Sequence, residues 1–139
     1  MIPDPLLTAF LETNYVVFSP AASFSLRIGK YSAGLAKLMS EHRANTAAIL
    51  TAYNPGAAPV DIKANRDAQK LLLDSIQMQS VSYFFGENIP ADADGPLEPT
   101  IVVMGMQLEQ ARALAEQFKQ LAFVFSDARA IPELVWMHS

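Results

Sequence analysis

The chain contains no cysteine, and this absence removes several kinds of chemistry at once. Without thiols there is no disulfide framework, no thiolate nucleophile and no cysteine-based zinc site. The first residues lack the basic stretch and apolar run of a signal peptide. No apolar run approaches the roughly 18 residues that a membrane-spanning helix needs. We therefore expect a cytoplasmic protein that has no membrane as a partner.

Clusters of basic residues are also missing. The chain has 10 Lys and Arg residues against 14 Asp and Glu, a net charge of −4 and a pI of about 5.0. No two basic residues are adjacent in the sequence. A nucleic-acid-binding surface normally needs a clustered basic face. The sequence therefore predicts no nucleic-acid partner.

The usual catalytic and metal-binding motifs are absent as well. Met104-Gly105-Met106 joins a predicted strand to a predicted helix without the glycine pattern of a phosphate-binding loop. The two histidines lie far apart in the sequence, and no spacing of histidines and carboxylates supports a metal site. We expect no cofactor and no metal, and the sequence leaves open whether the protein is an enzyme.

The composition is that of a folded protein. The chain has 139 residues, of which 51% are hydrophobic. A domain of this length buries roughly two-thirds of the surface that its unfolded chain exposes. We expect residues 1–139 to form a single globular domain.

The spacing of apolar residues predicts both helices and strands. Predicted helices cover residues 5–14, 32–42, 61 or 65 to 77, and 105–118. Predicted strands cover residues 15–18, 24–28, 47–53, 81–85, 100–104 and 122–125, with a short edge strand within 131–136. Residues 86–98 predict a surface loop that links two antiparallel strands. This order predicts an α+β (α/β-like) fold, with a single mixed sheet of about five to seven strands and three or four helices packed on it.

Polar residues gather where the nearly continuous apolar run 47–53 ends. Thr51, Tyr53 and Asn54 come directly before Pro55-Gly56, a pair that predicts a type II turn. Because Asn54 precedes a proline, we expect it to be extended. Ligand sites in sheets with helical crossovers tend to lie at the carboxyl ends of strands, which makes this end the candidate site.

Asn65 has two interpretations. If the helix begins early, near residue 61, Asn65 shares a stripe with Ala68, Leu72 and Ile76 and points at the sheet. If the helix begins at Arg66, Asn65 is its cap. Both interpretations place Asn65 close to the turn at 53–56. Glu98 and Gln120 join this cluster if their strands neighbour the run 47–53.

Several short motifs occur together in an order that is typical of one family. They lie at residues 15, 24–29, 51–56, 65, 98–99, 105, 118–122 and 131–136. The chain resembles the bacterial family catalogued as domain of unknown function 3293, which is built around a Thr-Ala-aromatic-Asn-Pro motif. The family pattern at 118–122 is Phe-Gly-Gln-Asn-Ala, whereas this chain has Lys119 and Leu121. The resemblance implies a bacterial domain of about this length and no particular mechanism.

Two functions follow from these features. The sequence favours a non-catalytic binding or protein-interaction module, with an unknown protein partner or a homodimer formed through the apolar C-terminal edge at 134–136. The alternative is a ligand-binding domain or enzyme with a pocket at the end of the strand 47–53. Its small polar or anionic ligand would contact Tyr53, Asn54, Asn65, Arg66 and Glu98.

Overall fold

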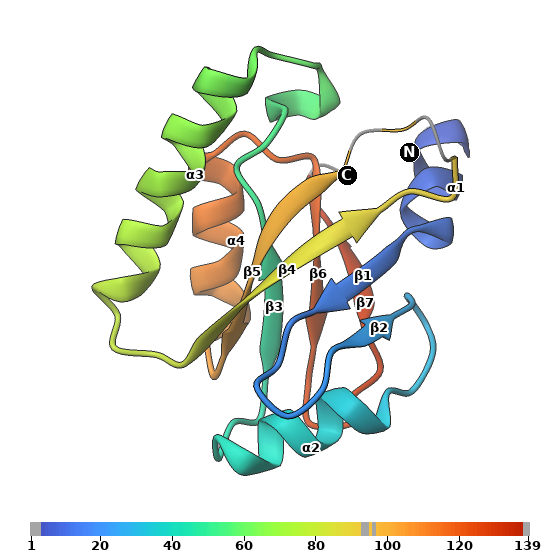
Figure 1. The fold of residues 1–139 in the computed structure, drawn as a ribbon, viewed down its shortest axis with the longest axis vertical. Helices are drawn as coiled ribbons and strands as arrows, with labels where there is room; N and C mark the ends of the chain where they lie inside the picture. The colour runs from blue at the N-terminus through green and yellow to red at the C-terminus, as the bar shows by residue number, and fades with distance from the viewer. Residues whose placement is uncertain (1–3, 93–94, 96, 138–139) are drawn as a thin grey trace.

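A computed structural model describes residues 4–92, 95 and 97–137 of the chain. Within them, four α-helices and seven β-strands follow one another in the order shown in Figure 1. The helices are α1 (Asp4–Glu12), α2 (Ala33–Glu41), α3 (Ile62–Gln77) and α4 (Leu108–Gln117). The strands are β1 (Asn14–Val17), β2 (Phe24–Leu26), β3 (Ala47–Leu50), β4 (Tyr83–Ile89), β5 (Glu98–Met104), β6 (Ala122–Ser126) and β7 (Glu133–Trp136).

All seven strands form one sheet in the order β2-β1-β4-β5-β3-β6-β7. The predicted α+β class, with a single sheet and helices packed on it, is confirmed. The prediction of a mixed sheet is wrong, because every pairing is antiparallel. The helices α3 and α4 each connect two strands of the same direction, but a third strand lies between the two. From β3 to β6 the chain therefore has the split βαβ arrangement of ferredoxin-like folds.

Both faces of the sheet are covered, which explains why β3 is apolar along its whole length. On one face, α3 and α4 pack against residues such as Leu50 and Val103. On the other face, α2 packs against residues such as Ile49 and Met104. The sheet curls, so β1 and β2 come round on the α2 side and join the same core (Figure 1).

The ends of β3, β4 and β5 differ from the sequence prediction. The strand predicted at 47–53 ends at Leu50, because the Thr51 hydroxyl donates a hydrogen bond to the Pro99 carbonyl and accepts one from the Tyr53 N–H. The loop predicted at 86–98 is shorter than expected, since β4 extends to Ile89 and β5 begins at Glu98. Residues 86–89 lack an apolar pattern and are held in the sheet by backbone pairing with β1.

The last strand, β7, lies at one edge of the sheet as predicted. Its Trp136 packs edge-to-face on Phe10 of α1, with ring centroids 6.3 Å apart. Thus α1 is joined to the opposite end of the chain. In the described part of the chain, no helix is both long and apolar enough to cross a membrane.

Gly86 lies in β4 between the neighbouring strands β1 and β5 and leaves no room for a side chain. A Cβ atom at this position would lie 2.4 Å from the carbonyl oxygen of Val16 and 2.7 Å from Oγ1 of Thr100. Backbone atoms cannot move away from such a contact without disturbing the sheet.

We therefore expect Gly86→Ala to lower the free energy of unfolding by about 1–3 kcal/mol, as overpacking does. Urea denaturation followed by circular dichroism measures the change. Gly29→Ala is the comparison, because a Cβ atom added at Gly29 would meet no other atom within 4 Å and tests only the cost of the positive φ of 83°. Unchanged stability of Gly86→Ala would contradict the close approach of the three strands.

Candidate functional site

A cavity of about 270 Å³ lies between α1 and the neighbouring ends of β1, β4 and β5. We refer to it as the α1 cavity. Its wall on the α1 side is apolar, with Leu6, Ala9 and Phe10. Further apolar residues line it from the turns, namely Ala57, Pro59, Pro90, Leu121 and Ala122. Its polar lining consists of Thr13, Tyr15, Tyr53, Asn54, Asn88, Glu98 and Gln120.

The floor of the α1 cavity is a row of side chains across three strands. Tyr15 of β1 is paired with Asn88 of β4, and Asn88 is paired with Glu98 of β5. Residues that are directly opposite in an antiparallel pair project from the same face of the sheet. The register of the sheet therefore places a phenol, an amide and a carboxyl group side by side. Asn88 was not predicted as a site residue, because the sequence around it resembles a loop.

Asn54 stands at the entrance of the turn and adopts a left-handed conformation, with φ 49° and ψ 65°. The prediction that it is extended is wrong. Asparagine tolerates this region better than most residues, and two hydrogen bonds hold it there. Its backbone N–H donates to Oδ1 of Asn65 at 2.8 Å, and Nδ2 of Asn65 donates to Oδ1 of Asn54 at 2.9 Å. The turn itself has the features of type II, since Ala57 N–H donates to the Asn54 carbonyl at 3.0 Å and Gly56 has φ 66°.

Asn65 lies inside α3, as the first of its two interpretations predicts. Asp61 caps the helix, because its carboxylate accepts a hydrogen bond from the Ala64 N–H at 2.8 Å. The side chain of Asn65 is buried, with 5% of its surface exposed, and it points at the turn. Asn65 does not line the α1 cavity. Its role in the structure is to hold Asn54.

Among the residues that the structure describes, Glu98 is the one carboxylic acid in the lining of the α1 cavity. Nδ2 of Asn54 donates to its Oε2 at 2.8 Å. Burial raises the pKa of Glu98 above the usual value of a glutamate, and the hydrogen bond from Asn54 offsets part of that rise. Among the described residues, no group donates to Oε1 of Glu98, and the buried Oδ1 of Asn88 also lacks a partner. Oε1 of Glu98 is thus available to a ligand, whereas Oδ1 of Asn88 is buried beneath the surface of the cavity.

Gln120 also joins the cluster, as the sequence suggested. Its Nε2 donates to the carbonyl oxygens of Tyr53 and Phe118, at 3.0 and 3.3 Å. Next to it, the Lys119 carbonyl accepts a hydrogen bond from the Gly56 N–H at 2.7 Å. Lys119 has φ 56°, a conformation that glycine adopts with least strain. A glycine at this position, as the resemblance led us to expect, would adopt the conformation with less strain than lysine.

Arg66 lies apart from the other predicted residues. It lines a separate groove of about 370 Å³ between α3 and the strands β4 and β5, together with Lys70, Leu73 and Phe85. Tyr53 contributes to both the groove and the α1 cavity. The structure therefore brings Tyr53, Asn54 and Glu98 together, places Asn65 behind them and leaves Arg66 outside.

A metal centre has no obvious place in this arrangement. In residues 4–92, 95 and 97–137, no three His, Asp or Glu side chains lie close enough together to hold an ion. The α1 cavity offers hydrogen-bond acceptors, one ionisable carboxyl group and apolar surface. Such a set suits recognition of a small molecule.

Comparison with known proteins gives one result. A family model described as protein of unknown function (DUF3293) matches residues 50–123, more than half of the chain. The matched segment begins at the end of β3 and includes Asn54, Asn65, Glu98 and Gln120. No curated protein and no solved structure matches the chain.

Removing the Asn65 amide should destabilise the protein. We expect Asn65→Ala to lower the free energy of unfolding by about 1–3 kcal/mol, because the Asn54 N–H and Oδ1 both lose a partner. Chemical denaturation measures the loss. The exposed neighbour Arg66→Ala is the control and should change stability by less than about 0.5 kcal/mol. Equal effects of the two variants would show that the pair does not hold the turn.

Replacing Lys119 with glycine should stabilise the protein. Lys119→Gly relieves a left-handed residue and should raise the free energy of unfolding by about 1 kcal/mol. The same change at Gln117, in the last turn of α4, should lower it by about 0.5–1 kcal/mol. Thermal and urea unfolding distinguish the two, and a loss of stability in Lys119→Gly would be contrary to the strain described.

Proposed function

The chain belongs to the family of proteins of unknown function DUF3293, and from its geometry we propose that it binds a small organic molecule in the α1 cavity. The observation that carries this proposal is a carboxylate oxygen, Oε1 of Glu98, that accepts no hydrogen bond from the described residues and borders an apolar wall. A ligand that donates a hydrogen bond to this oxygen and covers the wall gains both contacts at once.

The α1 cavity has the mixed lining that small-molecule sites need. Its apolar wall comes from α1 and its polar floor from the row Tyr15, Asn88 and Glu98. A volume of about 270 Å³ is slightly smaller than that of sites for drug-sized ligands. The cavity therefore suits a compact molecule with one polar end and a short apolar part.

The wall of the cavity is fixed in place by contacts at the end of α1. The Tyr15 hydroxyl donates to the Phe10 carbonyl at 2.8 Å, and Nη2 of Arg27 donates to the Leu11 carbonyl at 3.2 Å. The Arg27 cation also suits the negative end of the helix dipole. Because the wall is attached to β1 and to the residue after β2, the cavity has a defined shape before any ligand enters.

The side chains around the cavity favour binding over proton transfer. Amide groups do not titrate, and most of the polar lining consists of amides and hydroxyls. Burial raises the pKa of Tyr15 well above its usual range, so its hydroxyl stays protonated and keeps its bond to Phe10. The Thr13 hydroxyl donates to the Ala9 carbonyl at 2.6 Å and has no neighbouring base that would activate it as a nucleophile.

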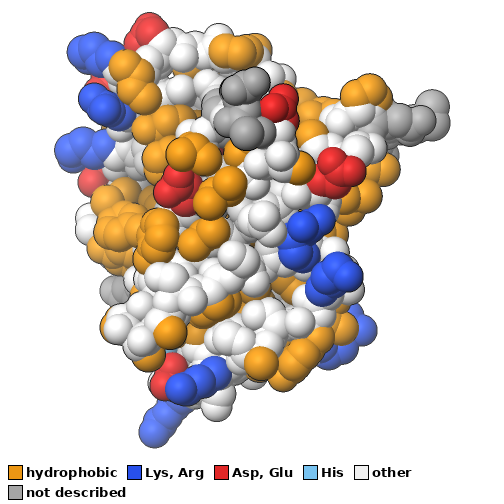
Figure 2. All heavy atoms as spheres, turned by 45° about the vertical axis from the view of Figure 1, so that its right-hand side comes forward, with side chains coloured by type: hydrophobic (Ala, Val, Ile, Leu, Met, Phe, Trp, Pro, Cys, Tyr) orange, Lys and Arg blue, Asp and Glu red, His pale blue; other side chains and the backbone are white. Residues whose placement is uncertain are grey.

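A second candidate is a protein-interaction module. Hydrophobic side chains gather at the surface close to Lys and Arg residues (Figure 2). The groove next to Arg66 contains Phe85, which is 54% exposed, and β7 offers an outer strand edge for a second copy of the chain. Light scattering coupled to size-exclusion chromatography tests the homodimer, and a monomer at high concentration would exclude pairing through β7.

The ligand proposal is tested by filling the cavity. A library of fragment-sized molecules is screened by thermal shift, and hits are located by NMR on the labelled protein. We expect hits that shift the amide signals of Tyr15, Asn88 and Glu98. Ala9→Phe, on the cavity wall, should weaken their binding at least about tenfold, the equivalent of 1.4 kcal/mol.

Thr8→Phe is the matched control, because Thr8 is an exposed α1 residue outside the lining of the cavity. It should leave the affinity of the hits unchanged. An absence of hits, or hits that bind the Ala9→Phe and Thr8→Phe variants equally, would reject the α1 cavity as a ligand site.

A further inference from the structure

We propose that the ligand of the α1 cavity carries a cationic amine, received by the carboxylate of Glu98, on a short apolar group. This inference rests on the proposed function and adds the chemical class of the ligand. It depends on three features of the described residues: which polar atoms are unpartnered, which charges line the cavity and what surrounds them.

Some polar atoms of the cavity have hydrogen-bond partners in the protein, and others have none among the described residues. Two of its three hydroxyl donors are occupied, because Tyr15 and Thr13 both donate to backbone carbonyls of α1. Nε2 of Gln120 is likewise engaged with two carbonyls. By contrast, Oε1 of Glu98 accepts nothing from the part of the chain that is described. This carboxylate oxygen therefore favours a ligand that donates hydrogen bonds, and an ammonium group offers three donors and no acceptor.

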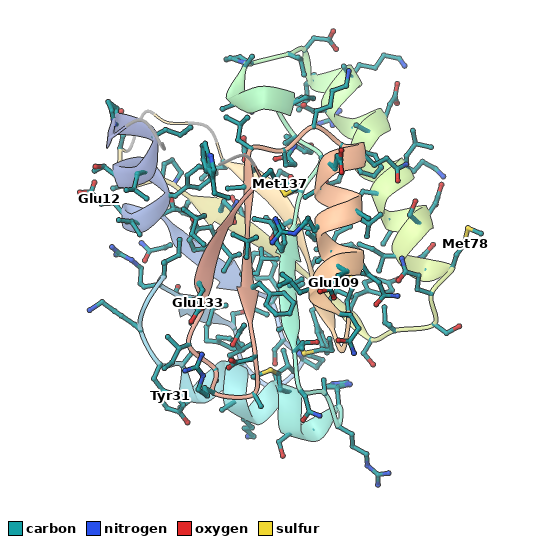
Figure 3. All side chains as sticks on the ribbon, turned by 180° about the vertical axis from the view of Figure 1, so that it is seen from behind. Glu12, Tyr31, Met78, Glu109, Glu133 and Met137 are labelled. Carbon is teal, nitrogen blue, oxygen red and sulfur yellow. The ribbon has the colours of Figure 1, made fainter. Side chains whose placement is uncertain are left out.

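The charge that the described residues bring to the lining is negative, which suits a cationic ligand. Of the titratable residues that the structure describes, Tyr15, Tyr53 and Glu98 line the cavity. Tyr15 is neutral, because burial raises its pKa. Among the described residues of the lining, Glu98 supplies the one carboxylate, and its charge is negative. Other charged side chains of the surrounding segments lie outside the lining, namely Glu12, Arg27, Glu87, Asp92 and Lys119. Glu12 projects away from the sheet (Figure 3).

Arg27 is a cation that could favour an anionic ligand if its side chain reached the cavity. It acts electrostatically on Tyr15, but its guanidinium group is engaged by the Leu11 carbonyl and, at 3.5 Å, by Oδ1 of Asn14. These contacts hold it against the C-terminal end of α1, outside the cavity lining. An anionic ligand would have to reach past Tyr15 to meet it and would place its charge beside Glu98.

The rest of the cavity suits the remainder of such a ligand. The rings of Phe10, Tyr15 and Tyr53 contribute to its lining. Aromatic rings attract cations through their faces and also cover apolar groups. The volume of about 270 Å³ limits the apolar part to a short chain or a small ring.

The experiment compares three probes with the same branched apolar part: isopentylamine, isopentyl alcohol and isovalerate. Their affinities are measured by NMR titration of the full chain at neutral pH. We expect the amine to bind about tenfold or more tightly than the alcohol, because hydrogen bonds to charged groups are worth about 1.5–3 kcal/mol. Isovalerate should bind more weakly than the alcohol.

Two variants of floor residues test whether the affinity for the amine depends on charge or on shape. Glu98→Gln keeps an oxygen for the Asn54 amide but removes the charge, so it should lower the affinity for the amine about tenfold and leave that for the alcohol unchanged. Asn88→Asp should raise the affinity for the amine, which makes the test independent of how well Glu98→Gln folds. Glu109→Gln, an exposed acid in the first turn of α4, is the matched charge control and should change neither affinity (Figure 3).

The pH dependence of the affinity for the amine is a separate test of the role of Glu98. Because the ionised form of Glu98 attracts the amine more strongly, affinity should be highest above the pKa of Glu98 and fall about tenfold in total as the carboxylate is protonated. Binding of the alcohol should stay flat across the same range. Since burial raises the pKa of Glu98, the fall should begin above the pH at which an exposed glutamate titrates.

The outcomes distinguish the two proposals. Equal affinity for amine and alcohol, or a preference for isovalerate, would overturn the cation but keep the α1 cavity as a binding site. Fragment hits in the cavity that include no amine would likewise overturn the cation and keep the α1 cavity as a binding site. If no molecule of either set shifts the signals of Tyr15, Asn88 and Glu98, both proposals fail.

Discussion

The reciprocal hydrogen bonds between Asn54 and Asn65 are the constraint on which the arrangement of the site depends. They hold Asn54 in a left-handed conformation, and this conformation turns its side chain toward Glu98. They also tie the chain after β3 to the second turn of α3. Two buried amides that satisfy each other are stable where a single one would cost free energy. The pair therefore organises the cavity, with Asn54 in its lining and Asn65 behind it.

The second constraint is the register of the antiparallel sheet. Each strand of the row β1, β4 and β5 contributes one polar side chain to the floor, and the close approach at Gly86 keeps these strands aligned. Antiparallel pairing through β1 extends β4 beyond the apolar core of the fold. A polar row at that extension can remain partly hydrated or receive a ligand, whereas inside the core it would be destabilising.

Hydrophobic spacing was sufficient to predict the order of the helices and strands, because each element buries a face that is visible in its own sequence. It also brought Asn54, Asn65, Glu98 and Gln120 to attention as neighbours. Asn88 escaped prediction, since its importance comes from the strands opposite it and not from its own segment. The conformation of Asn54 and the separation of Arg66 depend likewise on contacts between distant segments. Such pairings are long-range properties that local propensity does not encode.

The α1 cavity is assembled from two parts of different origin within the chain. Most of its polar floor lies in the segment 50–123 that the family model matches, whereas the apolar wall of α1 and Tyr15 lie outside that segment. A substitution in the wall changes the space left for the apolar part of a ligand and leaves the Asn54–Asn65–Glu98 network intact. Such a division lets related proteins diverge in the molecules they accept while the folding of the shared scaffold is unaffected.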